Sequence, residues 1–219
     1  MQEMLAAIRR SAVGIGVFAM VTAGVVAITQ VATQERIAAN VAEAQARALY
    51  EIVPRSVDPQ LHQHHFTLDA PELDLDQPQQ AWQAIVDGQV QTLILPVVAP
   101  DGYSGDIQLL VGIHRDASVA GVRVLAHKET PGLGDKIEPS KSDWLNGFIG
   151  KTTVGTGDKD WAVKKDGGQF DQFTGATITP RAVVQAVGRA IQYFRAHRER
   201  LLTPVTQAAE RATATHISQ

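Results

Sequence analysis

The first strong pattern along the chain is an uncharged apolar run near its N-terminus. From Ser11 to Gln34 there is no Asp, Glu, Lys or Arg, and most residues are Val, Ile, Ala, Gly or Phe. A bilayer core requires about 20 such residues in a helix. Arg9 and Arg10 precede the run and Glu35 follows it, and cytoplasmic flanks are enriched in Lys and Arg. The pattern predicts a transmembrane helix with a cytoplasmic N-terminus, so the rest of the chain is expected outside.

The alternative for this run is a cleaved signal peptide. Its apolar region is normally about 7–15 residues long and ends at a small-residue cleavage site. The run here is longer, and no convincing cleavage site occurs near Val31-Ala32-Thr33. We therefore expect an uncleaved anchor.

A helical pattern continues beyond the apolar run, from Glu35 to Ile52. The apolar positions that recur with helical spacing are Ile37, Val41, Ala44, Ala48 and Leu49. Spacing of i, i+3 and i+4 is typical of one face of a helix. The pattern predicts one long helix that leaves the bilayer and ends before Pro54.

The segment from Pro54 to Gln80 shows neither the helical nor the strand period. It contains four prolines and three histidines, His62, His64 and His65. Only the spacing of His62 or His65 to Asp69 suits a shared metal ion, and no second cluster completes a ligand set. We expect a solvated loop here and no metal site.

From Ala81 onward the pattern changes to that of β-strands. The expected strands are Trp82–Val86, Val90–Val98, Asp106–His114 and Val119–Leu125. Asp87-Gly88 between the first two is a hairpin-turn dipeptide. A helical run from Pro180 to about Leu202 closes the domain. Consecutive strands with short turns favour an antiparallel sheet, so the expected class is α+β, with flanking helices.

Composition narrows the classes of function. The chain has 219 residues, a net charge of −3 and no cysteine, which argues against a nucleic-acid partner and excludes disulfides and cysteine-ligated clusters. The expected parts are a cytoplasmic N-terminus (1–10), a transmembrane helix (11–33), a helical stalk with an irregular segment (34–80), a folded domain (81–202) and a polar, fraying tail (203–219).

The most informative stretch is Asp171-Gln172-Phe173-Thr174-Gly175-Ala176-Thr177. A helical run follows it at once, with Thr179 expected as the N-cap and Pro180 as the first helical residue. Helix N-termini attract anions because their first N–H groups lack partners and the macrodipole is positive there. A phosphate on Thr177 would lie about one turn from such a site. Thr-Gly-Ala-Thr alone is an ordinary helix-capping turn.

Three further motifs are weak when taken singly. Gly102-Tyr103-Ser104-Gly105 reads as a surface loop, and Lys165-Asp166-Gly167-Gly168 as a turn with a solvated lysine. Trp144 reads as a core anchor, although a flavin can also stack on a tryptophan. His127-Lys128-Glu129-Thr130-Pro131-Gly132-Leu133-Gly134 is more specific, because its glycines and proline turn the backbone sharply and permit close approach to a ligand.

Taken together, these motifs resemble those of a known flavoprotein family. The stretch Asp171–Thr177 fills every defined position of the covalent flavin-attachment motif D-x-x-[ST]-G-A-[ST]. With the anchor helix, G-Y-S-G, H-x-E-T-P-G-L-G and K-D-G-G, the chain resembles the FMN-binding subunits of Rnf-type (Rsx) and sodium-pumping NADH:quinone oxidoreductase complexes. Its length and motif are most similar to the G subunit of the Rnf complexes; the C subunit of the quinone reductase is the alternative.

The resemblance implies a membrane-anchored periplasmic electron carrier. FMN would be attached to Thr177 through a phosphoester, with Asp171, Thr174, Gly175 and Ala176 completing the attachment motif. The other residues expected to bind the flavin are Glu129, Thr130, Leu133, Gly134, Tyr103, Trp144 and Lys165, with Lys165 stabilising an anionic reduced flavin.

The resemblance also implies partners. These are the other subunits of an inner-membrane complex that couples NADH and ferredoxin or flavodoxin oxidation and reduction to ion movement, and a flavin transferase for maturation. No dinucleotide fingerprint occurs, so NADH is expected to bind another subunit. A rival from a different class is a membrane-anchored interaction module without a cofactor.

Overall fold

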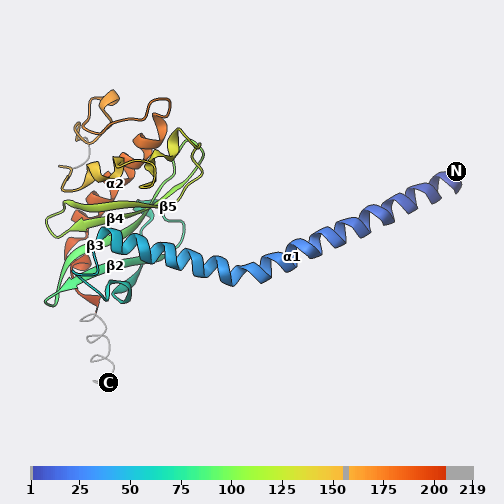
Figure 1. The fold of residues 1–219 in the computed structure, drawn as a ribbon, viewed down its shortest axis with the longest axis horizontal. Coiled ribbons are helices and arrows are strands. Elements are labelled where there is room, and N and C mark those ends of the chain that lie inside the picture. The colour runs from blue at the N-terminus through green and yellow to red at the C-terminus, as the bar shows by residue number, and fades with distance from the viewer. Residues whose placement is uncertain (1, 155–157, 206–219) are drawn as a thin grey trace, which may run out of the picture. The chain divides into compact units, whose positions relative to one another are not determined.

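The computed structural model describes residues 2–154 and 158–205. The chain divides into two compact units, Met1–Ala44 and Gln45–Gln219 (Figure 1). The units share one helix, because α1 runs without a break from Gln2 to Ile52. This confirms the prediction of a single long helix that ends before Pro54.

The first unit contains a helical stretch that is long and apolar enough to cross a membrane. It covers Ala12–Gln34, 23 residues, none of them buried. Three threonine hydroxyls within it donate to the carbonyl four residues earlier: Thr22 to Phe18 (2.5 Å), Thr29 to Val25 (2.8 Å) and Thr33 to Thr29 (2.8 Å). These bonds satisfy the only hydroxyl donors of the stretch, which suits surroundings of hydrocarbon.

The second unit is built on a five-stranded antiparallel sheet with the order β1-β2-β3-β4-β5. The strands are β1 His65–Leu68, β2 Gln79–Val86, β3 Gln89–Ala99, β4 Ile107–His114 and β5 Val119–Ala126. The last four confirm the predicted strands and the Asp87-Gly88 hairpin, whose two residues both have positive φ. The α+β class with an antiparallel sheet is confirmed.

Both faces of the sheet are buried, each against a different helix. Along β3, Leu93 and Leu95 belong to one apolar cluster, which includes the apolar face of α2. Ile94 belongs to the other, together with Leu49 and Ile52 near the end of α1. Because successive side chains of a strand point to opposite faces, this double cover explains why β3 reads as a nearly continuous hydrophobic run.

Two helices close the unit, α2 (Ile178–Ala196) and α3 (Arg198–Leu201). The apolar face of α2 is buried as predicted. The prediction of its N-cap is wrong: Thr177 is the N-cap, and Thr179 and Pro180 lie inside the first turn. Thr179 cannot act as the cap because its hydroxyl, fully buried, donates to Glu129 instead.

The segment between α1 and β2 is more ordered than the expected solvated loop. It contains β1 and two short 3₁₀ helices, and Leu61, Leu73 and Leu75 are buried. Asp58 organises it by accepting from the backbone N–H of Gln60 at 2.9 Å and of Ile85 at 3.0 Å. The sequence pattern does not reveal this order because buried positions here follow turns rather than a repeating period.

The prediction of a fraying tail falls largely on residues 206–219, which lie outside the described residues. Its start is bound to the sheet through the buried side chain of Gln83. The Gln83 amide donates to the carbonyls of Leu201 (2.9 Å) and Thr203 (3.0 Å), and its oxygen accepts from Val205 N–H (2.9 Å). Residues up to 205 therefore belong to the folded unit.

Replacing Gly112 with alanine is expected to destabilise the second unit. A Cβ at this position in β4 would lie 2.3 Å from Cγ2 of Ile52, so the Ile52 side chain or the end of α1 would have to shift. Overpacking of this kind costs about 1–3 kcal/mol. Thermal denaturation should show a lower midpoint for Gly112→Ala and almost none of this loss for Gly147→Ala, where the added Cβ meets nothing within 4 Å. Equal midpoints for the two variants would contradict this packing.

Candidate functional site: a cavity beside the first turn of α2

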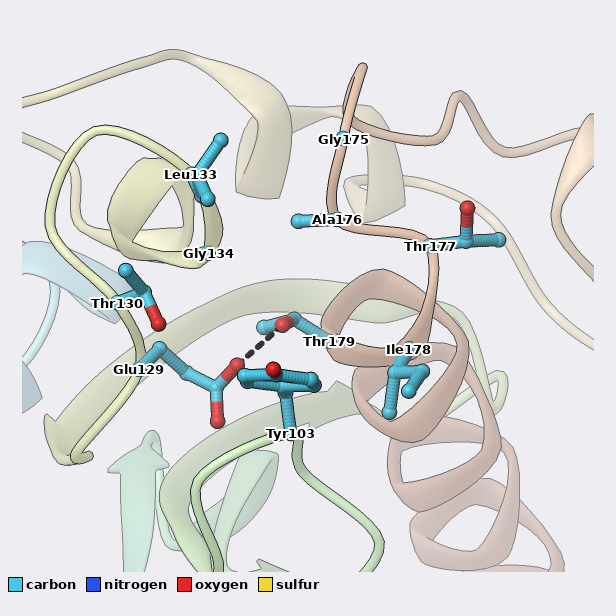
Figure 2. Close-up of a pocket in the computed structure, with 10 residues that line it drawn as sticks. All are labelled: Tyr103, Glu129, Thr130, Leu133, Gly134, Gly175, Ala176, Thr177, Ile178 and Thr179. Atoms are coloured by element: carbon cyan, nitrogen blue, oxygen red, sulfur yellow. Dashed lines mark hydrogen bonds between the residues drawn. The ribbon is translucent and has the colours of Figure 1, made fainter.

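A cavity of about 400 Å³ opens beside the first turn of α2 (Figure 2). Three separate segments line it: the loop after β3, the loop after β5, and the turn that leads into α2. The lining residues are Tyr103, Glu129, Thr130, Leu133, Gly134, Gly175, Ala176, Thr177, Ile178 and Thr179. Aliphatic and aromatic surface with a few convergent hydroxyls is typical of a small-molecule site of this size.

Glu129 joins the three segments at the base of the cavity. Only 4% of the residue is exposed. Its Oε1 accepts from the backbone N–H of Ser104 at 2.9 Å, and its Oε2 accepts from the hydroxyl of Thr179. Both carboxylate oxygens are therefore engaged by the protein. One buried acid thus fixes the G-Y-S-G loop and α2 relative to its own loop.

His127 fixes the backbone at Glu129. Its Nδ1 accepts from the Glu129 N–H at 3.1 Å, so the ring proton is on Nε2, which donates to Glu138 Oε1 at 3.0 Å. Gly134 then passes close to the acid: a Cβ there would lie 2.8 Å from Glu129 Oε2 and 2.9 Å from Thr179 Oγ1. The loop after β5 requires glycine at this point to close over Glu129.

The stretch Asp171–Thr177 forms a tight turn above the cavity. The Ala176 N–H donates to the Phe173 carbonyl at 3.2 Å, with Thr174 and Gly175 between them. Gly175 has φ +84°, which a turn with glycine at its third position requires. A Cβ on Gly175 would also lie 3.2 Å from Cδ2 of Leu133. The small residues of the motif therefore allow this turn and the opposite loop to approach each other.

Aromatic packing anchors the turn at its base. Phe170 and Phe173 flank the acidic start of the motif and are both buried. Phe170 stacks on Phe148 at 4.5 Å between ring centroids, and Phe173 meets the Trp144 ring edge-on at 5.1 Å. The indole Nε1 of Trp144 donates to the Asp171 carbonyl at 2.7 Å. The start of the motif is therefore held by the core.

Thr177 lies at the rim of the cavity, at the N-cap of α2. The residue is half-buried, and its hydroxyl makes no capping hydrogen bond. Figure 2 shows Ala176 pointing between the two loops, while the Thr177 side chain points away from the cavity. A group attached to this hydroxyl would begin outside the cavity, near the positive end of the helix dipole.

Four of the predicted site residues do not line the cavity. Trp144 instead contacts the motif through its ring, which meets Phe173, and its indole N–H, which donates to the Asp171 carbonyl. Asp171 is exposed and pairs with Lys164 at 2.5 Å. Thr174 is exposed at the tip of the turn. Lys165 is exposed too, and the contact it makes here is from its backbone N–H to Gln172 Oε1 at 3.1 Å. Lys165 is not among the residues that line the cavity, and its role toward the flavin stays a prediction.

An ion pair lies beside the rim. Arg181 in α2 donates from Nε and Nη2 to the two carboxylate oxygens of Asp166, at 2.7 and 2.9 Å. Hydrogen bonding to Arg181 lowers the pKa of Asp166, helped by the charges of Arg181 and Lys165. The pair is therefore present above the ordinary aspartate pKa and is lost as pH falls through the lowered value.

The sequence motifs left out two lining residues and the contacts that define the base of the cavity. Ile178 and Thr179 line it directly after the motif. The bond between Thr179 and Glu129 joins positions 50 residues apart, and no local pattern predicts such a contact. The sequence offered one indication that Ile178 and Thr179 line the cavity, which is that they directly follow the motif.

The cavity and its rim suit FMN. The volume and the mixed lining suit a flat aromatic ring system with polar edges, between Leu133 on one side and Tyr103 and Ile178 on the other. The hydroxyl of Thr177 suits a phosphoester, because it is accessible and lies at a helix N-terminus. Among the described residues, no group of three or more His, Cys, Asp or Glu side chains is placed to hold a metal ion.

Comparison with known proteins gives two family matches that together cover most of the chain. Residues 102–192 match the FMN-binding domain, and residues 1–52 match the RnfG N-terminal region. The first match contains the whole cavity lining.

Curated relatives are similar over almost their whole length. The G subunit of the ion-translocating oxidoreductase complex of Pseudomonas aeruginosa is 53% identical over 197 residues, which cover 89% of this chain and 92% of that protein. The protein of the same name from Vibrio cholerae is 45% identical over 199 residues, covering 90% and 95%. The one from Shewanella piezotolerans is 46% identical over 191 residues, covering 86% and 90%.

Proposed function

The chain belongs to the family of G subunits of ion-translocating oxidoreductase complexes, and from this premise we propose that it is the membrane-anchored FMN carrier of such a complex, with the flavin bound covalently to Thr177. The resemblance to the Rnf G subunit in the sequence motifs is confirmed by these relatives. The observation that carries the covalent part is the accessible, uncapped Thr177 hydroxyl at the rim of an FMN-sized cavity.

Five of the lining residues have a proposed task toward FMN. When bound, FMN supplies reversible electron transfer, and the protein binds, orients and tunes it. Leu133, Tyr103 and Ile178 cover the ring system with apolar surface. Thr130 offers a hydroxyl to its polar edge. Glu129 positions the lining from below, since both of its oxygens are engaged by the protein.

Covalent attachment makes physical sense for a carrier outside the cytoplasm. A dissociated FMN would diffuse away there, whereas a phosphoester retains it. A hydroxyl and a phosphate monoester do not condense spontaneously in water, so a flavin transferase must use an activated donor, a flavin whose phosphate carries a leaving group. The Thr177 oxygen displaces that group from phosphorus, the phosphoanhydride bond of the donor breaks, and the hydroxyl proton leaves with the displaced phosphate. The mature protein would then relay electrons between neighbouring subunits of the complex.

We expect the folded domain in the periplasm. Its N-terminal helix anchors the protein in the membrane, and Arg9 and Arg10 before the apolar run favour a cytoplasmic N-terminus. The natural chain contains no cysteine, so a cysteine introduced by substitution is the only thiol of the protein that a maleimide can label. A membrane-impermeant maleimide should label Asp76→Cys in intact spheroplasts and label Gln2→Cys only after lysis. The reverse labelling would overturn the orientation.

Denaturing gel electrophoresis under ultraviolet light tests the proposed function. The full chain is expressed in a host without flavin transferase, and again with the transferase present. A fluorescent band at the mass of the chain is expected only with the transferase. A colourless band in both hosts would remove the covalent carrier and favour the interaction module without a cofactor. Copurification with the other subunits separates an Rnf-type assembly from the quinone reductase.

A further inference from the structure

Arg181 lies one helical turn after Thr177 on the same side of α2. Thr177 has helical backbone angles, φ −85° and ψ −26°, so the two residues are related as i and i+4. That relation places their Cβ atoms about 5–6 Å apart. Helical side chains lean toward the N-terminus of their own helix. The guanidinium of Arg181 therefore extends toward the side of the helix on which Thr177 lies.

Asp166 holds the Arg181 guanidinium at this position. The bidentate bond uses Nε and Nη2, which leaves about three of the five N–H donors of an arginine free. Within the part of the chain that the structure describes, Arg181 has no other hydrogen-bond partner. The loop that carries Asp166 is itself tightly packed. Gly168 lies so close to Ala162 that a Cβ added at Gly168 would be 2.1 Å from the Ala162 carbonyl oxygen.

We infer that Arg181, positioned by Asp166, binds the phosphodiester that joins the flavin to Thr177. The inference rests on the proposed attachment at Thr177. Because the Thr177 side chain points away from the cavity (Figure 2), a phosphate on it lies beside the first turn of α2. Arginine presents planar, paired donors that match phosphate oxygens, so Arg181 holds the phosphate and the cavity holds the ring.

The local charges favour such a cation. A phosphodiester keeps one negative charge and adds it close to two exposed aspartates, Asp166 and Asp171. Lys164 is paired with Asp171. Arg181 is paired with Asp166 but keeps about three N–H donors beyond that bidentate bond, so it can bind the phosphate as well as Asp166. The helix N-terminus contributes further, but only a partial positive charge.

A thermodynamic cycle separates this role from ordinary packing. The detergent-solubilised full chain is prepared with and without flavin transferase, as the wild type, Arg181→Gln and Arg181→Lys. Arg195→Gln is the matched control, since Arg195 is an exposed arginine of the same helix and lies about 21 Å farther along it. The measured quantity is the rise in thermal midpoint that flavin attachment causes, with intact mass reporting the modified fraction.

The rise should be about 2–4 °C smaller in Arg181→Gln than in the wild type, and unchanged in Arg195→Gln. The difference should shrink in high salt, as expected for partly exposed charges. An equal rise in Arg181→Gln and wild type would overturn the inference. If Arg181→Gln is not modified at all, restoration by Arg181→Lys supports the inference and failure of both variants contradicts it. An unmodified wild type refutes the attachment itself, so the two failures are distinguishable.

Discussion

Replacing Thr177 with valine is expected to abolish the covalent flavin completely. Valine has nearly the shape of threonine but no hydroxyl, so no phosphoester can form at this position. The Thr177 side chain makes no capping hydrogen bond, so the loss to the fold is expected to be under about 0.5 kcal/mol. Flavin fluorescence of the denatured band, normalised to protein, should fall to background in cells that contain the transferase.

Two other variants make this result specific. Thr177→Ser keeps a hydroxyl and should retain the fluorescent band. Thr174→Ser keeps the motif at the exposed tip of the same turn and should also retain the band. Fluorescence that persists in Thr177→Val would move the attachment site away from Thr177.

Replacing Glu129 with alanine is expected to give the largest loss of stability among substitutions at the site. The change leaves the Ser104 N–H and the buried Thr179 hydroxyl without their acceptor. Hydrogen bonds to a charged group contribute about 1.5–3 kcal/mol each, and buried donors without partners add a further penalty. We expect the free energy of unfolding to fall by about 3–5 kcal/mol, measured by urea denaturation of the unmodified protein.

Glu129→Gln separates the effect of the Glu129 charge from the effect of its two hydrogen bonds. Glutamine can accept from Ser104 and donate to the Thr179 hydroxyl, so most of the stability should remain. The substitution removes a buried negative charge beside the cavity, so it should raise the reduction potential of the bound flavin. For a two-electron couple, a tenfold change in the equilibrium between oxidised and reduced flavin corresponds to about 30 mV. An unchanged potential would show that Glu129 acts only through packing.

Local patterns predicted most of the fold. The strands β2 to β5 stand out as apolar runs bounded by turn residues, and the long helices follow a period of 3.6 residues, both visible without tertiary information. The strand β1 was missed because it has only four residues, His65–Leu68, too few for alternation to stand out among prolines and polar residues. The N-cap of α2 was misplaced because Thr179 bonds to a residue in another loop.

The candidate site was predictable only in part, for a similar reason. The motifs identified Glu129, Leu133 and the Gly175–Thr177 turn, which the structure brings around one cavity; their roles toward FMN stay predictions. No motif indicates that both oxygens of Glu129 are engaged by the protein, or that Asp166 holds the side chain of Arg181. Those contacts depend on which loops meet in space, and the chain positions of the residues do not specify this.

Intact-protein mass spectrometry of the natively matured wild type tests the central claim most directly. The denatured polypeptide should carry the added mass of one FMN less one water, and fragmentation should assign the addition to the peptide that contains Thr177. A polypeptide with the mass of the bare sequence, isolated from cells that contain an active flavin transferase, would contradict the account.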